Sequence, residues 1–104
     1  MQQASGAGMP SNKYIDLTVG ATGSTYTAPA NGWFSLLRVV STANINITLT
    51  TNKKMSSRSV STTTGTQTLK ASIPVAKGDT LTVEWNGNSI GTYEFYFIYA
   101  EGEV

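Results

Sequence analysis

The stretch Tyr93-Glu94-Phe95-Tyr96-Phe97-Ile98-Tyr99-Ala100 decides the fold, because it is apolar or aromatic on both faces of an extended strand. Side chains alternate between the two faces of a strand. One face carries Tyr93, Phe95, Phe97 and Tyr99, and the other carries Glu94, Tyr96, Ile98 and Ala100. A strand of a small antiparallel sheet needs only one buried face. We therefore expect a second copy of the chain to cover the surplus face.

Seven further segments rich in Thr, Val, Ile and Tyr precede this stretch, and turn residues separate them roughly every ten positions. The expected strands are Lys13–Val19, Ser24–Thr27, Trp33–Ser41, Asn44–Thr51, Met55–Thr62, Thr66–Ile73, Thr80–Trp85 and Thr92–Ala100. No segment shows a helical period. The pattern predicts an all-β fold, an antiparallel two-sheet sandwich of the jelly-roll kind with about eight strands.

The side-chain patterns of individual strands predict which faces are buried. Ile45, Ile47 and Leu49 share one face of their strand, as do Leu81, Val83 and Trp85, so each of these strands should have one buried and one wet side. The segment from Trp33 to Val40 is instead apolar on both faces. We expect it to be a central strand or an intersubunit strand. The large apolar side chains Trp33, Phe34, Trp85, Phe95 and Phe97 are the expected core.

Three turns are chemically specified. Asn31-Gly32, Lys77-Gly78-Asp79 and Asn86-Gly87-Asn88 contain the residue types that supply positive φ angles in tight connections. We expect all three to connect strands.

The length and composition fit one domain. A chain of 104 residues forms one compact unit. Residues 1–12 are small and polar and include glycine, so burial cannot offset the entropy of ordering them. We expect residues 1–12 to be a flexible lead or linker and residues 13–104 to be a single β-sandwich domain.

Charge and composition argue against several function classes. The net charge is +1 and the basic residues are mostly scattered, so nucleic-acid binding is not expected. There is no cysteine and no histidine, which removes the commonest metal ligands and the commonest general base. No metal or cofactor is predicted. No apolar run approaches the roughly 18 residues that cross a bilayer, so membrane insertion is not expected.

The carboxylates are the remaining candidates for catalysis. They are Asp16, Asp79, Glu84, Glu94, Glu101 and Glu103. A glycosidase would need two of them about 5 to 10 Å apart. The alternative, in which all six are solvated or structural, is favoured because only Asp16, Glu84 and Glu94 fall within expected strands. We therefore predict a protein that is not an enzyme.

Two groups of residues are candidates for ligand binding. Trp85, Asn86, Asn88 and Tyr93 would form an aromatic platform with amides that bond to a sugar ring, unless Trp85 belongs to the core. Lys53, Lys54 and Arg58 surround an expected hairpin tip and would attract an anion, unless they are merely solvated.

A third group is a candidate subunit contact. Tyr96, Ile98 and Tyr99 lie in the aromatic strand, and interfaces are enriched in tyrosine. They are expected to contact a second copy of the chain.

Two turn-and-strand motifs carry a family resemblance. They are Thr25-Tyr26-Thr27-Ala28-Pro29-Ala30-Asn31-Gly32-Trp33 and Ile73-Pro74-Val75-Ala76-Lys77-Gly78-Asp79-Thr80-Leu81-Thr82-Val83. Together with the closing aromatic strand, they resemble small β-sandwich domains of bacteriophage tail fibres, head fibres and related virion proteins. The resemblance covers most of residues 24 to 100.

The resemblance implies a fold, an assembly and a location. The fold would be a trimeric jelly-roll head, similar in outline to tumour-necrosis-factor-like and complement heads. The role would be that of a virion module made in the bacterial host cytoplasm, a fibre tip that contacts a bacterial surface glycan or protein. One alternative is a capsid or baseplate decoration protein that contacts other virion proteins. The other is a stand-alone carbohydrate-binding module.

Overall fold

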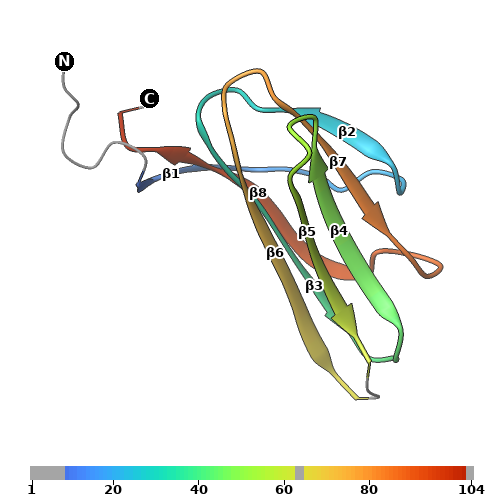
Figure 1. Cartoon of the computed structure of the whole chain (residues 1–104). Coiled ribbons are helices and arrows are strands. Elements are labelled where there is room, and N and C mark those ends of the chain that lie inside the picture. Colours follow the sequence, from blue (N-terminus) through green and yellow to red (C-terminus); the bar gives the residue numbers. More distant parts are fainter. Residues whose placement is uncertain (1–8, 63–64, 103–104) are drawn as a thin grey trace.

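The computed structural model describes residues 9–62 and 65–102 and places eight strands within them (Figure 1). The strands are β1 (Pro10–Asp16), β2 (Ser24–Thr27), β3 (Gly32–Val40), β4 (Ile45–Thr51), β5 (Ser56–Ser61), β6 (Gln67–Val75), β7 (Thr80–Trp85) and β8 (Thr92–Ala100). None of the described residues is helical. Every expected strand is present, and three have the predicted bounds.

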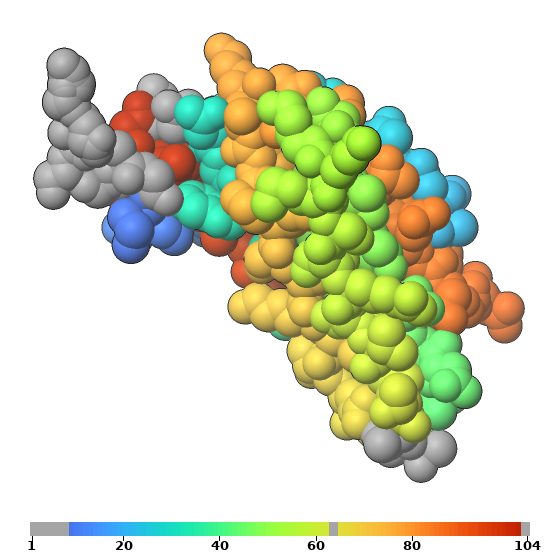
Figure 2. Space-filling view, in the orientation of Figure 1, coloured from blue at the N-terminus to red at the C-terminus, as the bar shows by residue number. Residues whose placement is uncertain are grey.

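The strands form two antiparallel four-stranded sheets packed as a sandwich. The first sheet has the order β1-β8-β3-β6 and the second has the order β2-β7-β4-β5. Strands distant in sequence therefore lie side by side, in the interleaved order of a jelly roll, as the strand pattern predicted. At one side of the sandwich β5 lies beside β6 (Figure 2), where the Ser59 hydroxyl donates a hydrogen bond to the carbonyl oxygen of Lys70.

The core lies between the two sheets. Its buried side chains alternate along β3, β4, β6, β7 and β8, as the period of two requires. They include Phe34, Leu36, Ile47, Leu49, Ile73, Leu81, Val83 and Phe97. Phe34 contacts Phe97 edge to face, with ring centroids 5.2 Å apart. The predicted buried faces of β4 and β7 are confirmed.

One core expectation is wrong. Trp33 alternates with Phe34 along β3, and because Phe34 points into the core, Trp33 points to the opposite face of the sheet. There it is half-buried, between Pro74 of β6 and Ile98 of β8 in the strand register. Trp85 is also only half-buried, although it packs against the core.

The first strand begins earlier than expected. β1 starts at Pro10, which pairs with Ala100 of β8, so Pro10 to Asn12 belong to the strand rather than to the expected lead. Met9 of that lead is also described, and its carbonyl oxygen accepts a hydrogen bond from the backbone N–H of Glu101, whereas residues 1–8 lie outside the described residues. β1 ends at Asp16, before the expected Val19, which instead belongs to the buried core.

Gly32 is required for a different reason than expected. Gly78 and Gly87 have positive φ angles of 88° and 96°, as predicted for their turns. Gly32 does not; it is the first residue of β3. A Cβ atom at Gly32 would overlap the carbonyl oxygen of Ile98 and the ring of Phe97. Glycine at this position therefore permits the close approach of β8 to β3.

We predict that Gly32→Ala lowers the free energy of unfolding by about 1–3 kcal/mol, because the methyl group must displace the β8 backbone. The measurement is a urea unfolding curve. Gly20→Ala is the matched control, since its methyl group meets the movable hydroxyl of Ser24 and should cost less than about 1 kcal/mol. An equal loss in the two variants would contradict this account of Gly32.

Candidate functional site

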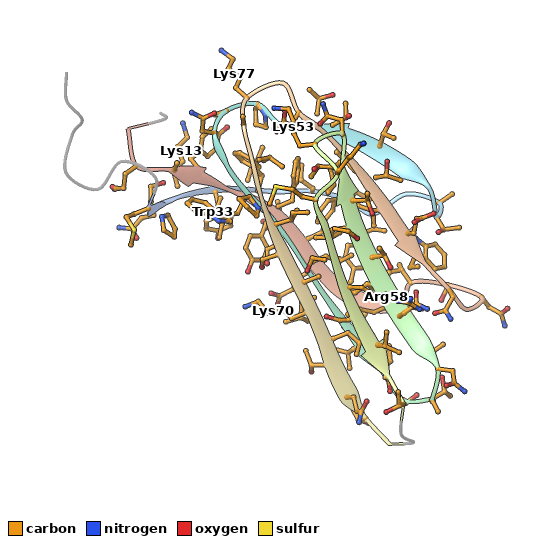
Figure 3. All side chains as sticks on the ribbon, in the orientation of Figure 1. Lys13, Trp33, Lys53, Arg58, Lys70 and Lys77 are labelled. Carbon is orange, nitrogen blue, oxygen red and sulfur yellow. The ribbon has the colours of Figure 1, made fainter. Side chains whose placement is uncertain are left out.

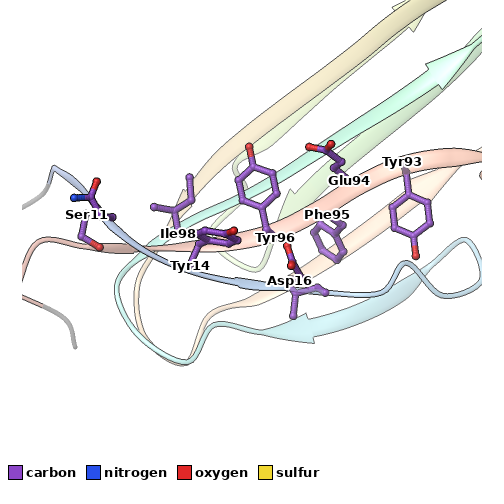
Figure 4. A pocket seen from close by; sticks show the side chains of 10 residues that line it. Ser11, Tyr14, Asp16, Tyr93, Glu94, Phe95, Tyr96 and Ile98 are labelled. Carbon is purple, nitrogen blue, oxygen red and sulfur yellow. The ribbon is translucent and has the colours of Figure 1, made fainter.

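The outer face of the first sheet carries a continuous row of apolar side chains. Because Phe95 and Phe97 of β8 point into the core, the alternate residues Glu94, Tyr96 and Ile98 point away from it. Figure 4 shows these three on one side of the strand and Phe95 on the other. The sequence predicted this two-sided strand, and the structure leaves its second face without a covering layer from the described chain.

The neighbouring strands continue this surface, which we call the aromatic face. It consists of Tyr14, Trp33, Leu37, Pro74, Tyr96 and Ile98. In the strand register, Tyr14, Ile98, Trp33 and Pro74 form one row across all four strands. Tyr14 and Tyr96 also contact each other edge to face, with ring centroids 6.1 Å apart.

The side chains of the aromatic face are more exposed than those of the core. Trp33, Leu37, Tyr96 and Ile98 are half-buried, and Tyr14 is 59% exposed. None of these side chains belongs to the core cluster or packs against it. A contiguous, partly exposed apolar surface of this kind marks an interaction site more often than a solvent-facing surface.

A groove of about 830 Å³ lies along one end of the aromatic face, between β1 and β8. Tyr14, Tyr96 and Ile98 line it together with the carboxylates of Asp16 and Glu94 (Figure 4). None of the described residues that line the groove is basic. The groove therefore combines apolar surface with negative charge.

Two residues of the expected sugar platform, Trp85 and Asn86, form hydrogen bonds within the fold. The indole N–H of Trp85 donates to the carbonyl oxygen of Gly20 at 3.1 Å, and the Arg38 guanidinium lies 5.6 Å from its ring centroid. Asn86 accepts from the backbone N–H of Asn46 and donates to the carbonyl oxygen of Asn44, both at 2.8 Å. The sequence offered no sign of these internal bonds.

The other two residues of the expected platform, Tyr93 and Asn88, differ in burial. Tyr93 packs against the core, and its hydroxyl accepts from the backbone N–H of Val19 at 3.2 Å. Asn88 is exposed in the connection between β7 and β8. Of the four expected residues, Asn88 is the one that is exposed, and the other three are half-buried. Binding of a sugar at these four residues stays a prediction.

The expected anion site is dispersed. Lys53 forms an ion pair with Asp79, with Nζ 3.2 Å from Oδ1. Lys54 occupies the turn after β4 with a φ of 61°. Arg58 lies on β5, where it is exposed opposite Thr48 on the outside of the second sheet, on the other side of the sandwich from Trp33 and Lys70 (Figure 3).

The structure separates the three expected interface residues. Tyr96 and Ile98 belong to the aromatic face. Tyr99 lies on the core side of β8, where its ring contacts Phe97 at 5.1 Å and the Lys13 ammonium lies 4.7 Å from its centroid. Sequence reasoning therefore found part of the surface and missed Trp33 and Leu37, which it assigned to the core or to a strand of unknown orientation.

Arg38 is a buried cation that sequence reasoning also missed. It is 3% exposed, on the core side of β3. It donates four hydrogen bonds to carbonyl oxygens, from Nε to Ile90 at 3.0 Å, from Nη1 to Asn46 at 3.0 Å, and from Nη2 to Asn86 at 2.7 Å and Ser89 at 2.8 Å. Burial lowers the pKa of Arg38, but an arginine stays charged in proteins. The signal was a charged residue on the same face as Phe34 and Leu36.

Asp79 fixes the turn that precedes β7. The backbone N–H of Ala76 donates to Oδ2 of Asp79 at 2.9 Å. This hydrogen bond lowers the pKa of Asp79 below the ordinary value of 3.8; burial opposes the shift, and Lys53 adds to it. Asp79 is thus a structural carboxylate.

The described residues contain no cluster of three or more acidic, histidine or cysteine side chains that would hold a metal ion. In the same part of the chain, no helix is long and apolar enough to cross a membrane.

No protein-family model and no curated protein matches the chain. Interpretation of function therefore depends on the geometry of the aromatic face and on the motifs of the sequence.

We expect Arg38→Lys to lower the free energy of unfolding by about 2 kcal/mol or more, because one ammonium cannot reach all four carbonyl oxygens and leaves some of them buried without a donor. Thermal or urea unfolding measures the loss. The control is Arg58→Lys, at an exposed arginine, which should change stability by less than about 0.5 kcal/mol. Equal effects at both positions would show that Arg38 does not anchor the β7–β8 connection.

Acid should destabilise the protein through Asp79. Its pKa is lower in the folded chain than in the unfolded chain, so its contribution is complete above about pH 5 and is lost as the pH falls below 3.8. The urea midpoint of the wild type should decrease from about pH 6 to about pH 3, and Asp79→Asn should show a smaller decrease. Glu84→Gln, at an exposed carboxylate, should retain the wild-type decrease. A full decrease in Asp79→Asn would remove Asp79 as its source.

Proposed function

We propose that the chain is a non-enzymatic, oligomeric virion module of a bacteriophage, a trimeric fibre-tip domain that contacts the host surface. The observation that carries the proposal is the aromatic face. It crosses all four strands of one sheet and includes half-buried Trp33, Leu37, Tyr96 and Ile98, none of which packs against the core cluster.

Self-association explains this surface best. The centres of subunit interfaces are enriched in tyrosine and tryptophan and depleted in charge. A small domain also has little stability to spare, and burial between copies adds to it. The jelly-roll strand order and the two turn motifs agree with the virion domains that the sequence resembles. A non-enzymatic role is supported by the structural role of Asp79 and by the absence, among the described residues, of any cluster of three or more acidic side chains.

Binding to a host would then follow from multivalency. Several linked copies, each with a weak contact, gain a factor of about 10² to 10⁴ over one contact. A decoration protein of the capsid or baseplate is the second candidate, because the same aromatic face would suit a fixed position in a particle. A stand-alone carbohydrate-binding module is the third, and it would need the chain to remain a monomer.

The decisive change is Tyr96→Asp, which places a charge in the middle of the aromatic face. The wild type should elute with a mass near three times 11.1 kDa, measured by light scattering during size exclusion, and the variant with a mass near 11.1 kDa. Thr48→Asp is the matched control, because Thr48 points outward from a central strand of the other sheet and should leave the mass unchanged. A monomeric wild type, or an unchanged mass in Tyr96→Asp, would overturn the proposal.

The role is tested with intact bacterial cells. Fluorescently labelled wild-type protein should bind cells of a susceptible strain, and the Tyr96→Asp variant should bind them at least about tenfold more weakly, since it loses multivalency. Binding to purified phage particles without binding to cells would instead favour the decoration protein.

A further inference from the structure

We propose that the aromatic face docks on a second copy of itself in one orientation, with Lys70 of one copy against the Glu94 and Asp16 carboxylates of the next. The proposal rests on the proposed function, because it requires that the chain self-associates. It adds what sets the relative orientation of the copies.

The charges that border the aromatic face are segregated by sign. Glu94 on β8 and Asp16 on β1 point outward from one half of the sheet, and both are exposed. Lys70 points outward from β6 at the opposite edge and is exposed too. The other basic residue on the edge strands β1 and β6 is Lys13, and its ammonium is directed to the ring of Tyr99 on the core side. The face therefore has an acidic side and a basic side.

These charges do not pair with one another within one copy. Leu37 of β3 is the register partner of Glu94 on one side and of Lys70 on the other. The backbones of Glu94 and Lys70 are thus two strand spacings apart, roughly 9 to 10 Å. Among the described residues, the ion pair that the structure contains is the one between Lys53 and Asp79. The acidic and basic sides are left for a partner.

A second copy matches this pattern. When two aromatic faces meet with the β6 side of one against the β1–β8 side of the other, Lys70 approaches the groove that holds Asp16 and Glu94 and that no described basic residue lines. The apolar side chains then lie at the centre of the contact and the charges at its rim, as in known interfaces. The opposite orientation would put like charges together, which disfavours it.

The same orientation serves more than one assembly. Two copies related by a two-fold axis would form two such contacts. In a three-fold ring, the β6 side of each copy would meet the β1–β8 side of the next, which gives one such contact per neighbour. Charge pairing therefore fixes which edge meets which, and the number of copies is measured separately.

Charge reversal tests the proposal. Lys70→Glu and Glu94→Lys should each weaken self-association by about tenfold, because each replaces an attraction with a repulsion at every contact. The double variant Lys70→Glu/Glu94→Lys should recover the wild-type dissociation constant to within about threefold. Sedimentation velocity over a range of concentrations gives these constants, and circular dichroism confirms that each exposed substitution leaves the fold intact.

Lys77→Glu is the matched control. It changes the net charge by the same amount as Lys70→Glu, but it lies in the turn between β6 and β7, away from the aromatic face, so association should stay at the wild-type level. Raising the salt concentration should weaken the wild type more than a variant that lacks both charges, Lys70→Ala/Glu94→Ala.

The outcomes separate this proposal from the one that it rests on. Two outcomes would overturn the charge pairing and leave self-association standing. In the first, the wild type is oligomeric and the single reversals leave its association unaffected. In the second, the double variant loses as much association free energy as the two single variants together. A monomeric wild type at every concentration would overturn both.

Discussion

The close pairing of β3 with β8 is the constraint on which the rest of this structure depends. Gly32 has no side chain where the carbonyl oxygen of Ile98 approaches, so the two central strands stay in register over their whole length. That register directs Phe34, Phe95 and Phe97 into one aromatic cluster between the sheets. It equally directs Trp33 and Ile98 outward, side by side. The core and the aromatic face are therefore two consequences of a single pairing.

A second constraint acts at the other end of β3. Arg38 occupies a core-facing position, yet its guanidinium is surrounded by carbonyl oxygens rather than by a carboxylate. Carbonyl dipoles replace the water that burial removes, and the planar fork reaches two separate segments at once, β4 and the connection between β7 and β8. The connection from Asn86 to Ile90 is thereby tied to the sheet. Trp85, whose ring lies beside the same guanidinium, is held with it.

Much of this fold was predictable from the sequence, because turn residues and the period of two are local signals. They located all eight strands and identified the buried faces of β4 and β7. The same signals were insufficient for β3, where both faces are apolar, so periodicity does not say which face meets the core. Trp33 was assigned to the wrong side for this reason. The roles of Gly32 and Arg38 depend on partners up to 66 positions away, Ile98 for Gly32 and Ile90 for Arg38, and no local pattern contains them.

The outer faces of the two sheets differ in the chemistry of their side chains. On the second sheet, the outward row consists of Thr25, Thr82, Thr50 and Ser56, register partners across β2, β7, β4 and β5. Hydroxyl groups at these positions bond well to water and gain little from burial. The outward row of the first sheet consists of Tyr14, Ile98, Trp33 and Pro74, which gain from burial. In the proposed assembly, which buries the aromatic face, the hydroxyl-bearing face would remain exposed to solvent.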